Sequence, residues 1–227
     1  MEIIYEDNHL IAVNKRVSDI VQGDKTGDKP LSEMAKTYLK EKYHKRWNVF
    51  LGVVHRIDRP VSGVVLFART SKALSRLNEM MKKHQIRKTY WAIVKNRPTA
   101  PCGSLTHYLV HNPAKNISVA HDKEVPNSQL ATLSYRVIGE VNGFFVLEID
   151  LQTGRHHQIR SQLAKIGSPI VGDVKYGYPV PDRDAGIHLH SRKMELMHPV
   201  SKLPVSIVAP APKDPLWDAF MDKYKNA

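Results

Sequence analysis

The chain has 227 residues, and its 34 Lys and Arg against 22 Asp and Glu give a formal net charge of +12. An apolar fraction of 42% is typical of a globular protein and excludes an intrinsically disordered chain. Cys102 is the single cysteine, which excludes a disulfide-stabilised secreted scaffold and a cysteine-based zinc site. Nucleic acid is the first candidate partner for the basic excess, because Lys and Arg neutralise phosphates. The alternative is a protein that merely has a high isoelectric point.

The N-terminus carries acidic residues where a signal peptide would be basic. No apolar run approaches the ~20 residues that are needed to cross a bilayer. We therefore expect a cytoplasmic protein that makes no membrane contact. The length fits one domain or two tightly joined halves.

Hydrophobic spacing in the first third of the chain predicts alternating strands and helices. The predicted strands are Glu2–Tyr5, Leu10–Asn14, Val49–Val54 and Val64–Ala68. One amphipathic helix covers Leu31 to Tyr43, and a second begins after a cap at Thr70 or Ser71. The polar stretch Ser18–Lys29 is expected to be a loop.

The remaining chain is richer in strands. The predicted strands are Lys88–Lys95, Leu105–Val110, Leu130–Ile138 and Phe144–Leu151, with two or three more between Ile187 and Val208. A helix is expected from Gly154 to Ile166, and a final one around Leu216 to Tyr224. The pattern predicts an α/β protein of the α+β type with a mixed, mostly antiparallel sheet. The weakest seam is at Asn96–Gly103, where Pro and Gly cluster.

The segment His55–Pro60 lies between two predicted apolar strands. It places one carboxylate, Asp58, among three basic side chains, and nearby cations favour the charged form of a carboxylate. Such a group can act as a nucleophile or a base. The alternative is an Asp in a turn that bridges to its Arg neighbours, and from this segment alone that alternative is favoured.

A second basic segment, Gly154–Arg160, opens the predicted helix that ends near Ile166. The free N–H groups and the positive end of the dipole make a helix N-terminus suitable for phosphate. Arg155, His156 and Arg160 would strengthen such a site. A solvated basic face is the alternative.

Tyr90 is the third candidate. On the predicted strand Lys88–Lys95 it shares a face with Ala92 and Val94. It could stack on a base or hydrogen-bond a ligand, although a strand Tyr more often packs in the core.

The 12 histidines invite a metal site, but no metal-ligand spacing accompanies them. The histidines in question are His156, His157, His188 and His190. The chain also has no Walker A or Gly-x-Gly-x-x-Gly pattern. We therefore expect no metal and no nucleotide cofactor.

Taken together, several short segments resemble the RluA-type family of RNA pseudouridine synthases. They are Tyr5–Asp7 with Val13–Lys15, His55–Asp58 with Ser62–Gly63, Lys88–Ala92, Thr153–Arg160, Gly167–Asp173, Leu189–His190 and His198–Pro199. They are similar to the family patterns H-R-[LI]-D-x-x-[TS]-S-G, K-x-Y-x-A, T-G-R-x-H-Q-I-R and G-x-P-I-x-G-D. The chain departs from the family at Arg16–Ser18 and at Val61, where the family has Thr.

The resemblance implies the pseudouridine synthase catalytic fold: a sheet in two halves, flanked by helices, with a central RNA-binding cleft. It also implies a single catalytic domain over residues 1–227. Many relatives carry an S4 domain in front, and none is expected here. The resemblance implies a monomer without cofactor that acts on a ribosomal RNA or a tRNA stem-loop.

The resemblance also assigns roles to individual residues. Asp58 would be the catalytic aspartate, and Tyr90 would pack on the flipped uridine and assist proton removal. Arg160 would pair with the catalytic aspartate, Arg56 would fill the gap left by the flipped base, and Arg155 would lie near RNA. The other expected RNA-binding residues are His55, Arg59 and His156.

Two other functions remain open. The first is a non-catalytic RNA-binding protein on the same scaffold. The retention of Asp58 together with Tyr90 and Arg160 favours the enzyme, because binding needs no carboxylate. The second, weaker alternative is a histidine-based metallohydrolase.

Overall fold

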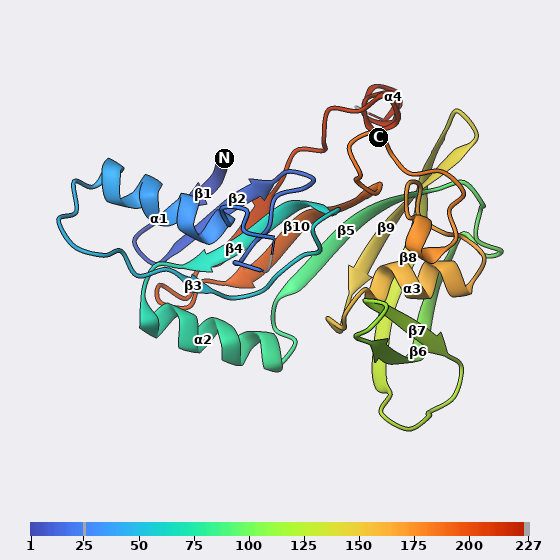
Figure 1. The fold of residues 1–227 in the computed structure, drawn as a ribbon, viewed down its shortest axis with the longest axis horizontal. Helices are drawn as coiled ribbons and strands as arrows, with labels where there is room; N and C mark the ends of the chain where they lie inside the picture. Colours follow the sequence, from blue (N-terminus) through green and yellow to red (C-terminus); the bar gives the residue numbers. More distant parts are fainter. Residues whose placement is uncertain (25, 225–227) are drawn as a thin grey trace. The chain divides into compact units, whose positions relative to one another are not determined.

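A computed structural model describes residues 1–24 and 26–224, and it divides into two compact units (Figure 1). Unit 1 comprises Met1–Arg87 and Ser191–Pro210, and unit 2 comprises Lys88–His190 and Ala211–Ala227. The chain therefore changes unit three times: after Arg87 and after His190, both within strands, and after Pro210, between the last strand and the last helix. The seam expected at Asn96–Gly103 does not divide the units, because this stretch connects two strands inside unit 2.

Unit 1 contains a sheet that is covered by a helix on each face (Figure 1). Its elements are β1 (Glu2–Glu6), β2 (Leu10–Lys15), α1 (Leu31–Lys42), β3 (Gly52–Val53), β4 (Ser62–Ala68), α2 (Ser71–Lys82), most of β10 (Leu189–Met197) and β11 (Pro204–Val208). The strand pairs β1–β2, β2–β4, β3–β4 and β10–β11 are antiparallel.

Alternation along the central strands of unit 1 explains its two cores. Ile11, Val13, Val65 and Phe67 lie in the cluster that packs with α1. Their neighbours Leu10, Ala12, Val64 and Leu66 lie in the cluster that packs with α2. Both faces are apolar because both are covered, and all of β4 is buried.

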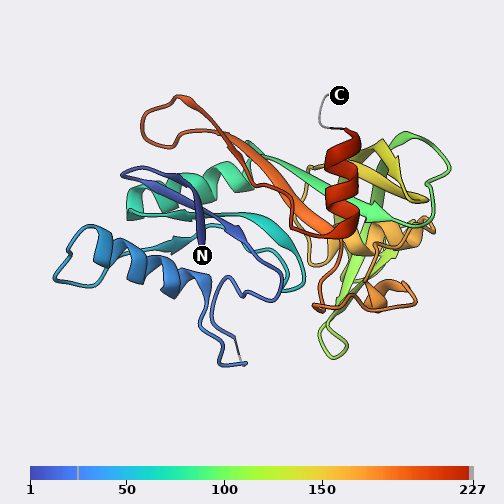
Figure 2. The same cartoon turned by 90° about the horizontal axis from the view of Figure 1, so that it is seen from above.

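Unit 2 is an antiparallel sheet in the order β5-β9-β8-β6-β7. Its elements are β5 (Arg87–Val94), β6 (Cys102–Asn112), β7 (Ile117–His121), β8 (Gln129–Val141), β9 (Phe144–Leu151), α3 (Gln158–Lys165), a 3₁₀ helix (Val174–Tyr176) and α4 (Pro215–Lys223). Helix α4, red in Figure 2, packs on β8 at Gly139, where a Cβ would meet the Tyr224 ring at 2.7 Å.

The α+β prediction with a mostly antiparallel sheet is confirmed, and three local predictions differ from the structure. The strand expected over Val49–Val54 has two residues, and β7 was not predicted. Helix α3 begins at Gln158, because its cap, His157, has a left-handed φ of 50° that an α-helix cannot accommodate. Within the described residues, no helix has the length and apolarity to cross a membrane.

Candidate active site

Asp58 is half-buried in the loop between β3 and β4, within unit 1. Its carbonyl accepts a hydrogen bond from the Val61 N–H at 3.0 Å, which closes a turn around Pro60. The turn leads into Gly63, whose φ is 110° and where a Cβ would lie 2.2 Å from the Ser191 carbonyl oxygen. Only glycine fits there, so the start of β4 packs closely against β10. This packing fixes the position of the backbone at the end of the Asp58 turn.

The side chain of Lys15 lies at the end of β2 and supports this turn from inside unit 1. It is 1% exposed, and its Nζ donates to the carbonyl oxygens of Arg16 at 2.9 Å, Arg59 at 2.9 Å and Val61 at 2.7 Å. Burial lowers the pKa of Lys15 to about 8, while the carboxylates of Asp19 and Asp58 act in the opposite direction. Lys15 is therefore a cation beside Asp58 that orients two of the turn's carbonyls.

His55 holds the other end of the loop. Its Nε2 accepts a hydrogen bond from the Leu66 N–H at 3.0 Å. The β3–β4 pairing ends with Val53 opposite Phe67, so the His55 ring takes the place of a strand partner for the next free donor of β4. This contact makes His55 a residue that positions the Asp58 loop.

Arg56 and Arg59, two of the predicted RNA contacts, are both exposed on this loop. The Arg59 guanidinium pairs with Asp28 at 2.6 Å, and both side chains are about half exposed. An exposed ion pair of this kind contributes little stability, so RNA phosphates could displace Asp28 at small cost.

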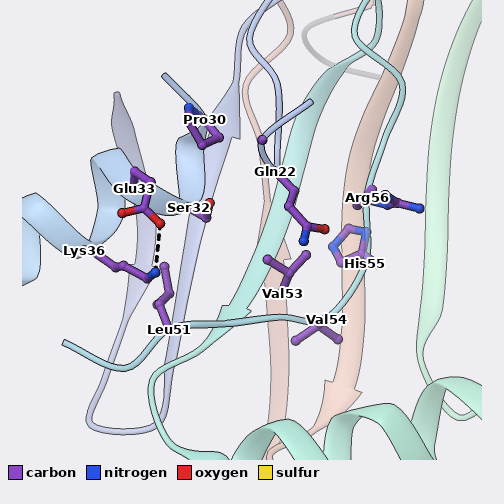
Figure 3. A pocket seen from close by; sticks show the side chains of 11 residues that line it. Gln22, Pro30, Ser32, Glu33, Lys36, Leu51, Val53, Val54, His55 and Arg56 are labelled. Carbon is purple, nitrogen blue, oxygen red and sulfur yellow. Dashed lines mark hydrogen bonds and ion pairs between the residues drawn. The ribbon is translucent and has the colours of Figure 1, made fainter. Parts of the chain in front are cut away.

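A pocket of about 630 Å³ lies beside Arg56, within unit 1 (Figure 3). Its lining residues come from the 22–23 loop, the first turns of α1 and residues 51–56. Leu51, Val53 and Val54 supply apolar surface, and the Gln22 side chain points toward His55 (Figure 3). Lys36 pairs with Glu33 at 2.8 Å, which leaves Arg56 as the pocket's remaining strong cation.

Tyr90 lies in the middle of β5 in unit 2. It is 7% exposed, and its backbone is opposite Ile149 of β9. The predicted strand is confirmed, and its pairing with β9 fixes the backbone of Tyr90.

Arg160, on α3 of unit 2, forms a buried bidentate ion pair with Asp173. Its Nε donates to Asp173 Oδ2 at 2.7 Å and its Nη2 to Oδ1 at 2.8 Å, and the side chains are 4% and 1% exposed. The guanidinium also lies over the Tyr176 ring, 5.0 Å from its centre. The orientation of Arg160 is therefore set within its own unit. Asp173 was not predicted as a site residue, although the Gly-x-Pro-Ile-x-Gly-Asp block contains it.

Gln158 organises the segment between β9 and α3. Its Oε1 accepts from the Thr153 hydroxyl at 2.7 Å and from the Arg155 N–H at 3.0 Å, and its Nε2 donates to the Thr132 carbonyl at 3.0 Å. Arg155 is exposed, and its Nε donates to the Leu130 carbonyl at 3.0 Å. Arg155 and His156 precede the helix, so they lie before its N-terminus and not in its first turns.

Three histidine rings stack from the surface of unit 2 toward its interior. The ring of His156 lies 4.0 Å from His111 and 3.8 Å from His157. Both nitrogens of His156 have partners, with Nδ1 at 2.9 Å from the Ser118 hydroxyl and Nε2 at 3.2 Å from Asn116 Oδ1. His156 is therefore tied to the β6–β7 hairpin by both ring nitrogens.

His157 is the buried member of this stack. Its Nδ1 lies 2.9 Å from the Tyr176 hydroxyl. Burial lowers the pKa of His157 to about 2, and the positive charge of Arg160 adds to the effect. The ring is neutral at physiological pH, so it has a structural role next to Arg160.

Among the described residues, one His/Asp cluster could hold a cation: Asp182, His188 and Asp214, all in unit 2. Asp182 Oδ2 lies 3.2 Å from Nδ1 of His188, and Asp214 Oδ1 lies 3.0 Å from Nε2. Asp214 also caps α4 by accepting from the Leu216 N–H at 2.9 Å. With a carboxylate at each ring nitrogen, the cluster resembles an ion-pair network that holds α4 rather than an open metal site. The absence of a metal remains a prediction.

The comparisons with known proteins agree with the sequence. The family model described as RNA pseudouridylate synthase matches residues 9–165. A tRNA pseudouridine synthase C of Vibrio cholerae is 30% identical, over 99% of this chain and 96% of the relative. A ribosomal large subunit pseudouridine synthase D of Xylella fastidiosa is 32% identical, over 94% of this chain and 67% of the relative.

Solved structures of pseudouridylate synthases share the fold of this chain. The human RNA pseudouridylate synthase domain containing 4 protein matches with a TM-score of 0.79 and 21% identity, over 99% of this chain and 93% of that one. The resemblance drawn from the sequence motifs is thereby confirmed. The chain belongs to the RNA pseudouridylate synthase family and is of the RluA type.

Proposed function

We propose that the protein converts a specific uridine of ribosomal RNA or tRNA to pseudouridine, with Asp58 as the nucleophile. The observation that carries the proposal is the family match, which runs through the segments of Asp58, Tyr90 and Arg160. The geometry of the Asp58 turn supports it, because Lys15 and Gly63 fix the backbone that follows this carboxylate and His55 fixes the segment before it.

The reaction is an isomerisation, so every atom of the uridine is retained. Asp58 attacks the nucleotide, and the C1′–N1 bond breaks. The uracil turns, C5 bonds to C1′ and the covalent bond to Asp58 breaks, which returns the free carboxylate. C5 then loses its proton and N1 gains one. Tyr90 would pack on the base and assist removal of the C5 proton. The pairing of Arg160 with the catalytic aspartate remains a prediction, and within unit 2 its guanidinium binds Asp173.

The chain's basic side chains would supply RNA binding. A uridine inside a helix has to be extruded at a cost of a few kcal/mol, and an unpaired loop lowers this cost. Arg56, Arg59 and Arg155 are exposed and can reach phosphates. His55 and His156 contribute by holding the loops that carry these arginines.

Mutation of Asp58 separates the enzyme from a non-catalytic RNA-binding protein. Pseudouridines would be mapped in RNA from cells that lack the gene and carry wild type, Asp58→Asn or Asp218→Asn. Asp218 is an exposed residue of α4 and provides the matched control. We expect Asp58→Asn to lose the product completely and to keep RNA affinity within about twofold, because RNA binding does not depend on this carboxylate. Product formed by Asp58→Asn would overturn the mechanism.

Monomeric state, cytoplasmic location and independence of metal and nucleotide cofactors remain predictions. Activity that survives treatment with a chelator would also dismiss the metallohydrolase alternative.

A further inference from the structure

The loop that follows α1 presents aromatic and basic side chains to solvent. Every residue from Lys40 to Asn48 is exposed. Trp47 is 85% exposed, Phe50 47% and Tyr43 43%, and Trp47 is the most exposed large hydrophobic residue in the described part of the chain. We call Tyr43, Lys45, Arg46, Trp47 and Phe50 the α1-end patch.

The backbone of this patch is held in place although its side chains are exposed. Helix α1 ends with His44 in a left-handed conformation, φ 49°. The His44 N–H donates to the Glu41 carbonyl at 3.2 Å and the Lys45 N–H to the Lys40 carbonyl at 3.0 Å, the pattern of a Schellman cap. Beyond the cap, Val49 and Leu51 pack in the α1 core. The loop is thus anchored on both sides of Trp47.

The charge around Trp47 is strongly positive. Residues 40–47 contain Lys40, Lys42, Lys45 and Arg46 against one carboxylate, Glu41. Lys42 pairs with Glu6 at 2.8 Å. Neither Lys45 nor Arg46 forms an ion pair within residues 1–24 and 26–224.

We propose that the α1-end patch is a second RNA-contact surface that binds an unpaired stretch of the substrate RNA. One base stacks on Trp47, and Lys45 and Arg46 contact the adjacent phosphates. Exposed aromatic rings between basic side chains are the combination by which proteins bind single strands without reading their sequence. The proposal rests on the proposed function, because RNA is then the substrate.

The patch is separate from the pocket beside Arg56, although both lie on α1. The pocket includes Ser32, Glu33 and Lys36 in the first turns of the helix. The patch begins where α1 ends, and a helix of 12 residues is about 18 Å long. Lys40 is exposed on α1 between the two and provides positive charge there, whereas Lys36 is paired with Glu33. A strand lying along α1 would therefore meet positive charge from the pocket to the patch.

Binding of a fluorescein-labelled 20-nucleotide oligouridine, measured by anisotropy between 50 and 200 mM salt, tests the proposal. We expect Trp47→Ala to weaken binding about five- to tenfold, because one base loses its stacking partner. The double variant Lys45→Ala/Arg46→Ala should reduce the salt slope by about 1.4, since two contacts to a single strand each contribute about 0.7.

Intrinsic fluorescence provides an independent readout. Trp217 is 3% exposed and stacks with Trp91, whereas Trp47 is in water. Oligouridine should quench the red-shifted emission of wild type, and Trp47→Phe should lose this quenching while keeping most of the affinity.

Matched controls come from the other face of unit 1. Lys72→Ala/Lys82→Ala removes two exposed charges of α2, and Leu203→Ala removes a side chain that is 65% exposed. Both should bind oligouridine within about twofold of wild type.

Two outcomes would overturn the patch proposal: unchanged affinity and quenching in the Trp47 variants, or a loss in Lys45→Ala/Arg46→Ala no larger than in the α2 control. The second outcome would leave a protein partner as the occupant. Pseudouridine mapping in cells distinguishes the two proposals. An active enzyme whose Trp47→Ala variant binds normally refutes the patch alone. Quenching of Trp47 in a protein that makes no pseudouridine refutes the enzyme alone.

Discussion

Units 1 and 2 each bury one basic side chain at a candidate catalytic segment, Lys15 in unit 1 and Arg160 in unit 2. The hydrogen-bond acceptors of the two side chains differ. In unit 1, three neutral carbonyl oxygens accept the hydrogen bonds of Lys15. In unit 2, the carboxylate of Asp173 binds Arg160 bidentately. Carbonyl groups orient a cation without neutralising it, and burial accordingly lowers the pKa of Lys15 to about 8.

The difference indicates different tasks. An ion pair cancels most of its own field, so the Arg160–Asp173 pair mainly fixes the geometry of a planar guanidinium. Within the described part of the chain, Lys15 has no bidentate carboxylate partner, and its positive charge lies close enough to Asp19 and Asp58 for both carboxylates to act on its pKa. Unit 1 therefore places a positive charge near the Asp58 carboxylate, whereas unit 2 fixes the orientation of the Arg160 guanidinium.

Removal of one partner of the ion pair should have the largest effect on stability. Asp173→Asn removes the negative charge that binds Nε and Nη2 of the buried Arg160, and the free energy of unfolding should fall by about 3–5 kcal/mol. Urea denaturation measures it. The apolar pair Arg160→Met/Asp173→Leu is the control, because it removes both charges and should be more stable than Asp173→Asn. Equal loss in the two variants would contradict a charge-based explanation.

Lys15→Met should have a smaller effect on folding and a larger one on catalysis. The three carbonyl groups lose their buried donor, which lowers the free energy of unfolding, but the cost of burying the Lys15 charge also disappears. The net loss should be about 1–3 kcal/mol. Loss of the cation and of the fixed turn should lower the rate of pseudouridine formation at least tenfold under conditions where the variant is folded. Lys72→Met, on the exposed side of α2, should change neither quantity. A Lys15→Met enzyme with normal activity would show that Asp58 does not depend on this charge.

His157 predicts a modest pH dependence of stability. Its pKa is about 2 in the folded protein and near 6.5 in the unfolded chain, so the unfolded state binds more protons below pH 6.5. The contribution of neutral His157 to the free energy of unfolding is present above pH 6.5 and is lost as the pH falls. The loss is about 1 kcal/mol between pH 6.5 and 5.5. His157→Asn should flatten the stability curve in this range, and Glu33→Gln on exposed α1 should leave it unchanged. An identical slope in wild type and His157→Asn would show that His157 is accessible to protons.

The helices, strands and motif segments could be predicted because their signals are local. Strand alternation and helical spacing come from the geometry of a few consecutive residues. Thr70 is an example, since its hydroxyl oxygen accepts from the Ala73 N–H as its position before the apolar stripe predicts. The order of the motifs was likewise sufficient for the family.

The partners across the fold were not predictable from local patterns. Lys15 reads as the polar end of a strand, and only the turn from a distant segment makes it a buried donor. Arg160 and Asp173 are 13 residues apart, and the loop between them has no regular periodicity. The burial of His157 was not predicted either, because it depends on the packing of this ring against Tyr176.

Two halves were expected, but the positions at which the chain passes from one to the other were not predicted. Two of the three crossings lie inside β5 and near the start of β10, where the composition is that of any strand, and only the crossing after Pro210 lies in a Pro-rich loop. The residues thus specify local structure, basic character and family. Contacts between segments that are far apart in the chain decide which charged side chains become buried. They also decide which aromatic side chains, such as Trp47, remain exposed to solvent.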